Sequence, residues 1–116
     1  MMFALVKDSK NLSMYGDIPE VTFATFDEAE TYYGDWDDAI SIRDNLLSAI
    51  DEHIEDNLLD LSDIEYFDKE RCVILKQILE NKMSEPCSKR LHELYDILYG
   101  YVLRAIELGT GVEIEL

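Results

Sequence analysis

Short apolar segments with strand character stand at both ends of the chain, and they constrain the fold more than any other feature. Residues 2–6 (MFALV) form an apolar run without helical spacing, which is typical of a buried strand. Residues 112–116 (VEIEL) alternate strictly between apolar and acidic side chains, which indicates a final strand. Helical patterns occupy the middle of the chain. This order predicts an α+β fold in which the terminal strands share one sheet and the helices pack on it.

Helical spacing predicts three long helices. They are expected from about Asp35 to Leu58, from Ser62 to Met83, and from Ser84 to Gly109. The second helix opens with a Ser-Asp-Ile-Glu capping box, and its expected buried stripe includes Ile64, Phe67 and Ile74. Pro86 suits the first turn of the third helix, and Gly109 suits its C-cap.

Shorter elements are expected before the first long helix. Asn11–Tyr15 favours a short strand, and the alternation over Val21–Phe26 favours another. Thr25 and Glu28 match a capping box, which predicts one brief helix that ends at Gly34. The sequence therefore predicts a single α+β domain, residues 1–116, with three long helices and one short helix on a small sheet formed by strands near both termini.

Negative charge is concentrated in one part of the chain. Between Asp17 and Asp68 there are seventeen acidic residues and one basic residue, Arg43, so this segment carries a formal charge of −16. The other 64 residues hold nine acids and nine bases and are neutral. Charge of this kind reports on solubility and partners more than on fold. Asp51/Glu55 and Glu52/Asp56 are like-charge pairs at helical spacing, which favours a use for the charge in binding.

The composition also excludes partners and compartments. Nucleic acid and anionic membranes would be repelled, because binding them requires clustered lysine and arginine. No apolar run is long enough to span a membrane, and residues 1–6 lack the features of a secretory signal. Cys72 and Cys87 lack the spacing of a zinc or redox site, and we expect two buried or half-buried thiols without a disulfide. A cytoplasmic protein without cofactor or metal is the expectation.

Aromatic and acidic residues are clustered at residues 32–38, where the first long helix is expected to begin. Exposed tyrosine and tryptophan among carboxylates suit a cationic protein partner, because the rings act as anchors and the carboxylates pair with lysine or arginine. The candidate partner-binding residues are Tyr32, Tyr33, Asp35, Trp36, Asp37, Asp38, Asp44, Asp51 and Glu55.

The segment Tyr-Tyr-Gly, three residues, then Asp-Ala-Ile at 32–40 resembles the barstar family of intracellular ribonuclease inhibitors. The resemblance covers nine residues and implies that Tyr32 and Asp38 contact a ribonuclease. Ile42 stands where that family has its dominant acidic anchor, and the alternating βα order of the family is not matched.

These patterns favour a non-enzymatic, immunity-type inhibitor that blocks the substrate cleft of a cationic toxin, most plausibly a nuclease. One alternative is an acidic adaptor or regulatory module with another partner. A second is a magnesium-dependent nucleotide pyrophosphatase, since Glu52/Glu55 and Glu93/Asp96 resemble its paired acidic motifs.

Overall fold

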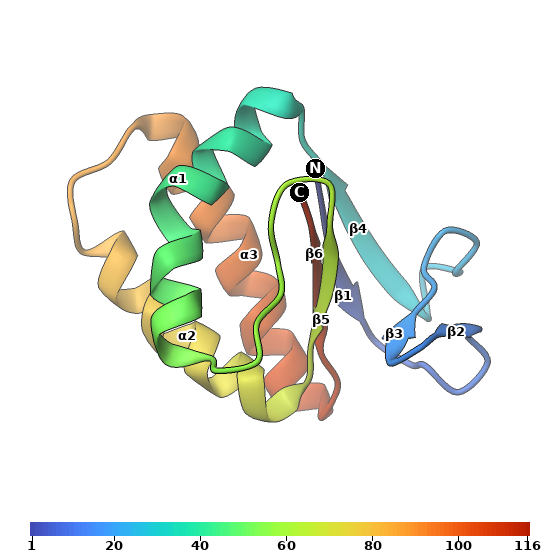
Figure 1. The fold of residues 1–116 in the computed structure, drawn as a ribbon. Helices are drawn as coiled ribbons and strands as arrows, with labels where there is room; N and C mark the ends of the chain where they lie inside the picture. The colour runs from blue at the N-terminus through green and yellow to red at the C-terminus, as the bar shows by residue number, and fades with distance from the viewer.

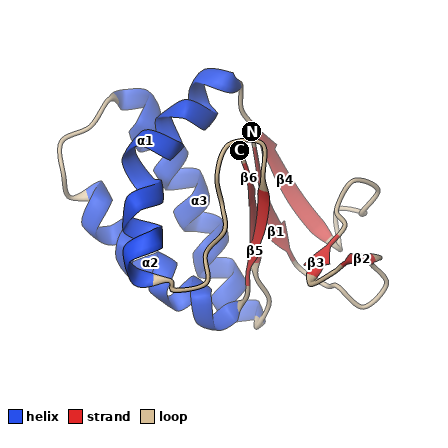
Figure 2. Cartoon of the chain, in the orientation of Figure 1, coloured by secondary structure: helices blue, strands red, loops and turns tan.

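The computed structural model describes residues 1–116 and has two layers, a four-stranded antiparallel sheet and three helices on one of its faces (Figure 1). The strands lie in the order β4-β1-β6-β5. A two-stranded hairpin, β2–β3, lies on the other side of the sheet, away from the helices (Figure 2). In chain order the elements are β1 (Met2–Val6), β2 (Met14–Tyr15), β3 (Ile18–Pro19), β4 (Ala29–Tyr33), α1 (Trp36–His53), β5 (Ile64–Phe67), α2 (Lys69–Met83), α3 (Lys89–Leu108) and β6 (Val112–Glu115).

The terminal strands β1 and β6 pair in the middle of the sheet, as the end segments of the sequence predicted. All five residues of β1 are buried, because both faces of this strand are covered. Phe3 and Leu5 point into the large core beneath the helices. Met2 and Ala4 point to the opposite face, which we call the outer face, where they pack with Val21 in a smaller core.

Each long helix is bounded by side chains that satisfy its free backbone groups. Asp35 caps α1 and forms a reciprocal capping box with Asp38. Asp68 caps α2, and Ser88 caps α3. Gly109 ends α3 with a φ of 73°, a left-handed conformation that glycine adopts without strain. The three predicted long helices are therefore present, with different bounds.

The region before α1 differs from the prediction. No strand forms over Val21–Phe26, and the expected short helix is absent. The capping bond of Thr25 does form, since its backbone N–H donates to Glu28 Oε1 at 2.9 Å. It closes only one turn, because the next five residues become β4, which pairs with β1 along its whole length. Sheet pairing outweighs a weak local helical signal here.

The segment before α2 is also a correction. Ile64 and Phe67 belong to the edge strand β5, which pairs with β6, and the capping box at Ser62 starts no helix. Ser62 instead has a φ of 64°. Because residues 64–67 pair with β6, they are not part of the helix. The helix α2 begins at Lys69 instead, with Asp68 as its N-cap. Ile74, expected in the buried stripe of α2, is 38% exposed.

The end of α1 comes earlier than predicted. The helix stops at His53, and Leu58, expected on its apolar side, lies in the following loop and is exposed. Glu55 and Asp56 consequently do not form helical pairs with the acids before them.

Candidate functional site

Three of the predicted acidic residues of α1 form one exposed stripe. Asp37, Asp44 and Asp51 follow one another at seven-residue intervals, so they lie on the same side of the helix about 10 Å apart. Glu55 follows just after the helix and is also exposed. We call Asp37, Asp44, Asp51 and Glu55 the acidic ridge. Because α1 packs on α2 and α3, the three aspartates of the ridge lie along a rigid element about 27 Å long, and Glu55 lies just beyond its end.

Two aromatic side chains stand at the N-terminal end of the ridge. Tyr33, the last residue of β4, is 68% exposed, and Trp36, the first residue of α1, is 58% exposed. Asp35 is exposed between them. The structure thus brings three of the predicted residues together at the corner where β4 meets α1.

The two remaining predicted residues, Tyr32 and Asp38, belong to an internal cluster. The Asp38 carboxylate is 4% exposed and accepts two hydrogen bonds from Arg90 of α3, at 2.9 and 2.8 Å. Arg90 also donates to Tyr32 Oη at 2.9 Å. The Arg90 hydrogen bonds hold the pKa of Asp38 below its usual value. Asp38 therefore links α1 to α3 and takes part in the capping box of α1. Ile42, the position at which the barstar family has its acidic anchor, is fully buried in the core.

Folding neutralises part of the acidic segment. Five of its seventeen carboxylates lie within 4 Å of a lysine or arginine nitrogen, and twelve do not. The paired ones are Glu30, Asp38, Asp44, Glu65 and Asp68. Of the ridge, only Asp44 is paired, with its neighbour Arg43, and both side chains are substantially exposed. Most of the negative charge therefore remains available to solvent or to a partner.

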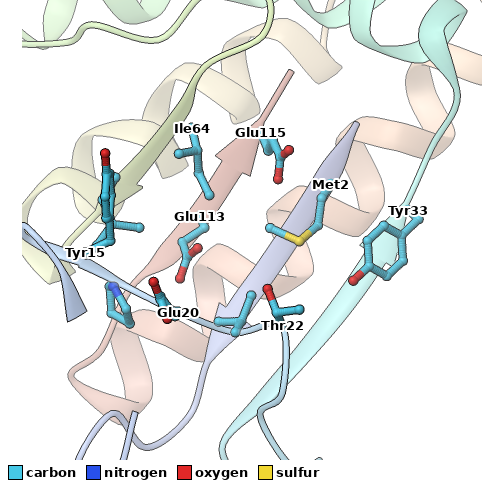
Figure 3. A pocket seen from close by; sticks show the side chains of 11 residues that line it. Met2, Tyr15, Glu20, Thr22, Tyr33, Ile64, Glu113 and Glu115 are labelled. Carbon is cyan, nitrogen blue, oxygen red and sulfur yellow. The ribbon is translucent and has the colours of Figure 1, made fainter. Parts of the chain in front are cut away.

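A second acidic feature lies on the outer face, where a half-open pocket of about 320 Å³ is formed (Figure 3). The strands of the main sheet form its floor, and residues 18–22, which comprise β3 and the three residues after it, form its far side. Glu20, Glu113 and Glu115 line it together with Tyr15 and Tyr33. The apolar lining residues are Met2, Ile18, Pro19, Val21 and Ile64, and Thr22 completes the set.

Glu113 is the unusual residue of this pocket. The alternation in residues 112–116 predicted a strand and gave Glu113 no role. In the structure Glu113 is only 1% exposed, and its Oε2 atom has no hydrogen-bond partner. Burial raises the pKa of Glu113 to about 8, and the nearby charge of Glu115 adds to the rise. The sequence reasoning missed this residue, because only the covering segment after β3 turns the outward face of β6 into a buried one.

The carboxylates of the magnesium-dependent alternative are placed differently. Glu93 pairs with Arg90, and Asp96 pairs with His92. No group of three or more histidine, cysteine, aspartate or glutamate side chains could hold a metal ion. These four acidic residues therefore do not form a metal centre.

The two cysteines are unpaired, as expected, but only one is buried. Cys72 lies in the core, where burial raises the pKa of its thiol to about 12, and Cys87 is exposed before α3. None of the three helices is long and apolar enough to cross a membrane.

Comparison with protein-family models, with curated proteins and with solved structures finds no match to this chain. The ridge and the pocket are therefore interpreted from their own chemistry.

Proposed function

We propose that the protein is an acidic, non-enzymatic inhibitor of the immunity type, which binds a cationic protein and blocks its substrate-binding cleft. The partner chemistry that suits it is a basic nuclease toxin, whose cleft attracts polyanions. A cytoplasmic setting, in which Cys72 and Cys87 stay reduced, fits this role.

The observation that carries the proposal is the set of twelve carboxylates in one segment without a cationic partner within 4 Å. Holding so many like charges in a compact state costs stability through mutual repulsion. The cost is offset when an oppositely charged surface is bound. The acidic ridge also has a rigid backbone, which lowers the ordering cost of association.

The proposed interface combines charge with aromatic anchors. Asp37, Asp51 and Glu55 supply free charge along the ridge, and Tyr33 and Trp36 supply exposed rings at one end. Partly buried rings and desolvated ion pairs dominate the binding energy of most interfaces, whereas peripheral charges chiefly accelerate association. We accordingly assign the anchoring role to the β4–α1 corner and the steering role to the rest of the ridge. Tyr32 and Asp38 are assigned to holding the corner in place.

The test uses a purified and immobilised basic nuclease, chosen first from any that is encoded beside this chain. The association rate constant is measured by surface plasmon resonance at 50 and 300 mM NaCl. Steering predicts a fall of about tenfold or more between these concentrations. The double variant Asp37→Asn/Glu55→Gln is expected to bind several-fold more slowly at 50 mM. A control variant with the same charge change, Asp8→Asn/Glu107→Gln, alters exposed acids outside the acidic segment and is expected to bind almost as fast as the wild type.

Two results would contradict the proposal. One is an association rate that does not respond to salt, and the other is an equal loss in the ridge variant and the control. Binding and steering without inhibition of a nuclease activity would instead favour the adaptor alternative. The arrangement of neighbouring genes discriminates further, because an adjacent toxin-like reading frame favours immunity and a metabolic operon favours the adaptor.

A further inference from the structure

The pocket on the outer face opens on the side of the sheet opposite the helices (Figures 1 and 3), and none of the four ridge carboxylates lines it. Of the residues assigned to the proposed interface, Tyr33 alone also lines the pocket. All four strands of the main sheet contribute residues to its lining, and the rest comes from the hairpin region. None of its eleven lining residues is a lysine, arginine or histidine, whereas three are glutamates. The pocket is therefore negative and has no internal counter-ion.

A buried carboxylate without a partner is costly. Glu113 is 1% exposed, Oε2 receives no hydrogen bond, and no basic group lies within 4 Å of the side chain. Buried polar groups in folded proteins are nearly always paired, and an unpaired one calls for an explanation such as a ligand that completes it. Figure 3 shows the Glu113 side chain directed into the pocket that Met2, Glu20 and Thr22 surround.

The remaining lining restricts the ligand further. Met2, Val21 and Ile64 provide an apolar wall, which suits methylene groups. Tyr15 and Tyr33 are exposed at the rim, where an aromatic ring favours an adjacent organic cation. The three carboxylates are not arranged to hold a metal ion. The chemistry that satisfies both the carboxylates and the wall is a cationic group on a short alkyl chain.

We propose that this pocket is a binding site for one alkylammonium or alkylguanidinium group, with Glu113 as its buried counter-ion. Glu20 and Glu115 lie nearer the solvent and attract the cation to the opening. The same chemistry is carried by a free amine and by the end of a lysine or arginine side chain. The inference goes beyond the proposed function and does not depend on the ridge.

Binding is expected to be coupled to the loss of a proton. The titratable groups that face Glu113 in the pocket and on the adjoining strand β5 are Glu20, Glu115, Tyr15, Tyr33 and Tyr66. None of them is cationic, so none favours ionised Glu113. With a pKa of about 8, Glu113 is ionised in about one molecule in ten at pH 7. Because the cation selects the ionised form, its apparent affinity should rise about tenfold between pH 7 and pH 9.

The experiment is a titration of the ¹⁵N-labelled protein with butylammonium and with propylguanidinium at constant ionic strength, followed by amide chemical shifts. We expect saturable shifts centred on residues 112–115, 20–22 and 64. Uncharged 1-butanol serves as the matched ligand control. Glu113→Gln should weaken binding at least tenfold, whereas Glu107→Gln, which removes the same charge from the exposed surface of α3, should leave it within twofold.

A second measurement needs no variant. Calorimetric titration in two buffers of different ionisation enthalpy gives the number of protons released, and we expect close to one per cation bound at pH 7. The ligand source is distinguished by the peptides Gly-Lys-Gly and Gly-Arg-Gly, blocked at both ends. Tighter binding of a peptide than of the free alkyl cation assigns the site to a protein side chain. Binding of the free cation with exclusion of both peptides assigns it to a small amine.

Several outcomes would overturn the proposal. Shifts that rise linearly and spread over the acidic surface would mean general ion association. Equal binding of 1-butanol would mean a purely apolar pocket. Binding without proton release would mean that Glu113 is not the counter-ion, and saturation of the same amides by calcium chloride would mean a metal site.

Discussion

Glu113 is the residue at which burial and charge conflict most strongly. An acid with a raised pKa in the folded state binds its proton more tightly there than in the unfolded chain. Its folded pKa is about 8, against an ordinary value of 4.5. The favourable contribution of Glu113 to the free energy of unfolding is therefore fully present below pH 4.5 and is lost as the pH rises toward 8.

Glu113→Gln should remove this pH dependence, because glutamine has a similar shape and cannot ionise. We expect the variant to gain stability over the wild type on the order of 3 kcal/mol at pH 9, and much less at pH 5. Urea unfolding at the two pH values measures the difference. Glu107→Gln is the control, and an equal effect of Glu113→Gln at both pH values would contradict the assignment.

Two glycines illustrate how local surroundings decide the effect of one methyl group. A Cβ at Gly111 would collide with the backbone oxygen of Phe67 and with the ring of Tyr66, whereas a Cβ at Gly100 meets nothing within 4 Å. Gly100 also lies inside α3, where alanine is the better helix former.

We therefore expect Gly111→Ala to destabilise the protein by about 1–3 kcal/mol, and Gly100→Ala to stabilise it by about 0.5–1 kcal/mol. Denaturant midpoints of both variants provide the test. The two glycines are matched in chemistry, so effects of the same sign would show that the packing around Gly111 is not as described.

At the level of elements, one ion pair, between Asp38 and Arg90, joins α1 to α3. Asp38 is almost fully buried, while the Arg90 side chain is about half exposed. Removing Arg90 leaves a buried carboxylate without its strongest partner. The exposed pair Arg43–Asp44 joins neighbouring residues of one helix and offers a comparison.

Arg90→Ala should lower the free energy of unfolding at pH 7 clearly more than Arg43→Ala does, because only the former leaves a buried carboxylate without its partner. The folded pKa of Asp38 lies below its ordinary value of 3.8, so the pair contributes stability above that value and loses it as the pH falls. The gap between wild type and Arg90→Ala should accordingly narrow below about pH 4. Chemical unfolding from pH 3 to pH 7 measures it, and a gap that persists unchanged would indicate lost packing alone.

The elements also show where local patterns succeed. Residues 2–6 form a continuous apolar run and the three long helices have strong periodicity of their own, and these parts of the prediction were confirmed. Residues 29–33 and 64–67 have weak local preference, and the strands β1 and β6 recruited them by backbone pairing. Neither predicted capping box starts a helix. At Thr25 the capping hydrogen bond forms and closes a turn, whereas Ser62 adopts a left-handed backbone conformation. An Asp-x-x-Asp pattern at Asp35 and an aspartate at 68 were the caps actually used.

For the whole molecule, the main consequence is electrostatic. A net charge of −16 on 116 residues, with twelve unpaired acids in one segment, should oppose the compact state. At 0.1 M salt the repulsion between exposed charges is largely screened beyond about 10 Å.

We expect the melting temperature to rise by several degrees between 10 and 300 mM NaCl at pH 7, which corresponds to roughly 1 kcal/mol for a domain of this size. Scanning calorimetry measures the shift. The ridge variant Asp37→Asn/Glu55→Gln should start from a higher melting temperature and respond less to salt. A melting temperature that is flat or falls with salt would contradict the repulsion argument.

The candidate site divides in the same way. The acidic ridge and its exposed aromatic end follow from residue spacing and composition. Of the nine predicted residues, Tyr32 and Asp38 are the two that bond to Arg90 of α3. The pocket around Glu113 was not predictable, because its floor, wall and rim come from residues 2, 15, 18–22, 33, 64, 113 and 115, which are far apart in the chain.

By itself the sequence determined the terminal strands, the three helices and the excess of negative charge, because periodicity and composition are properties of local segments. Only the tertiary structure decided which weak segments became β4 and β5, which carboxylates Arg90 and Arg71 neutralise, and that Glu113 is buried. Each of these depends on contacts between residues far apart in the chain, whose energies exceed the local preferences that a sequence pattern expresses.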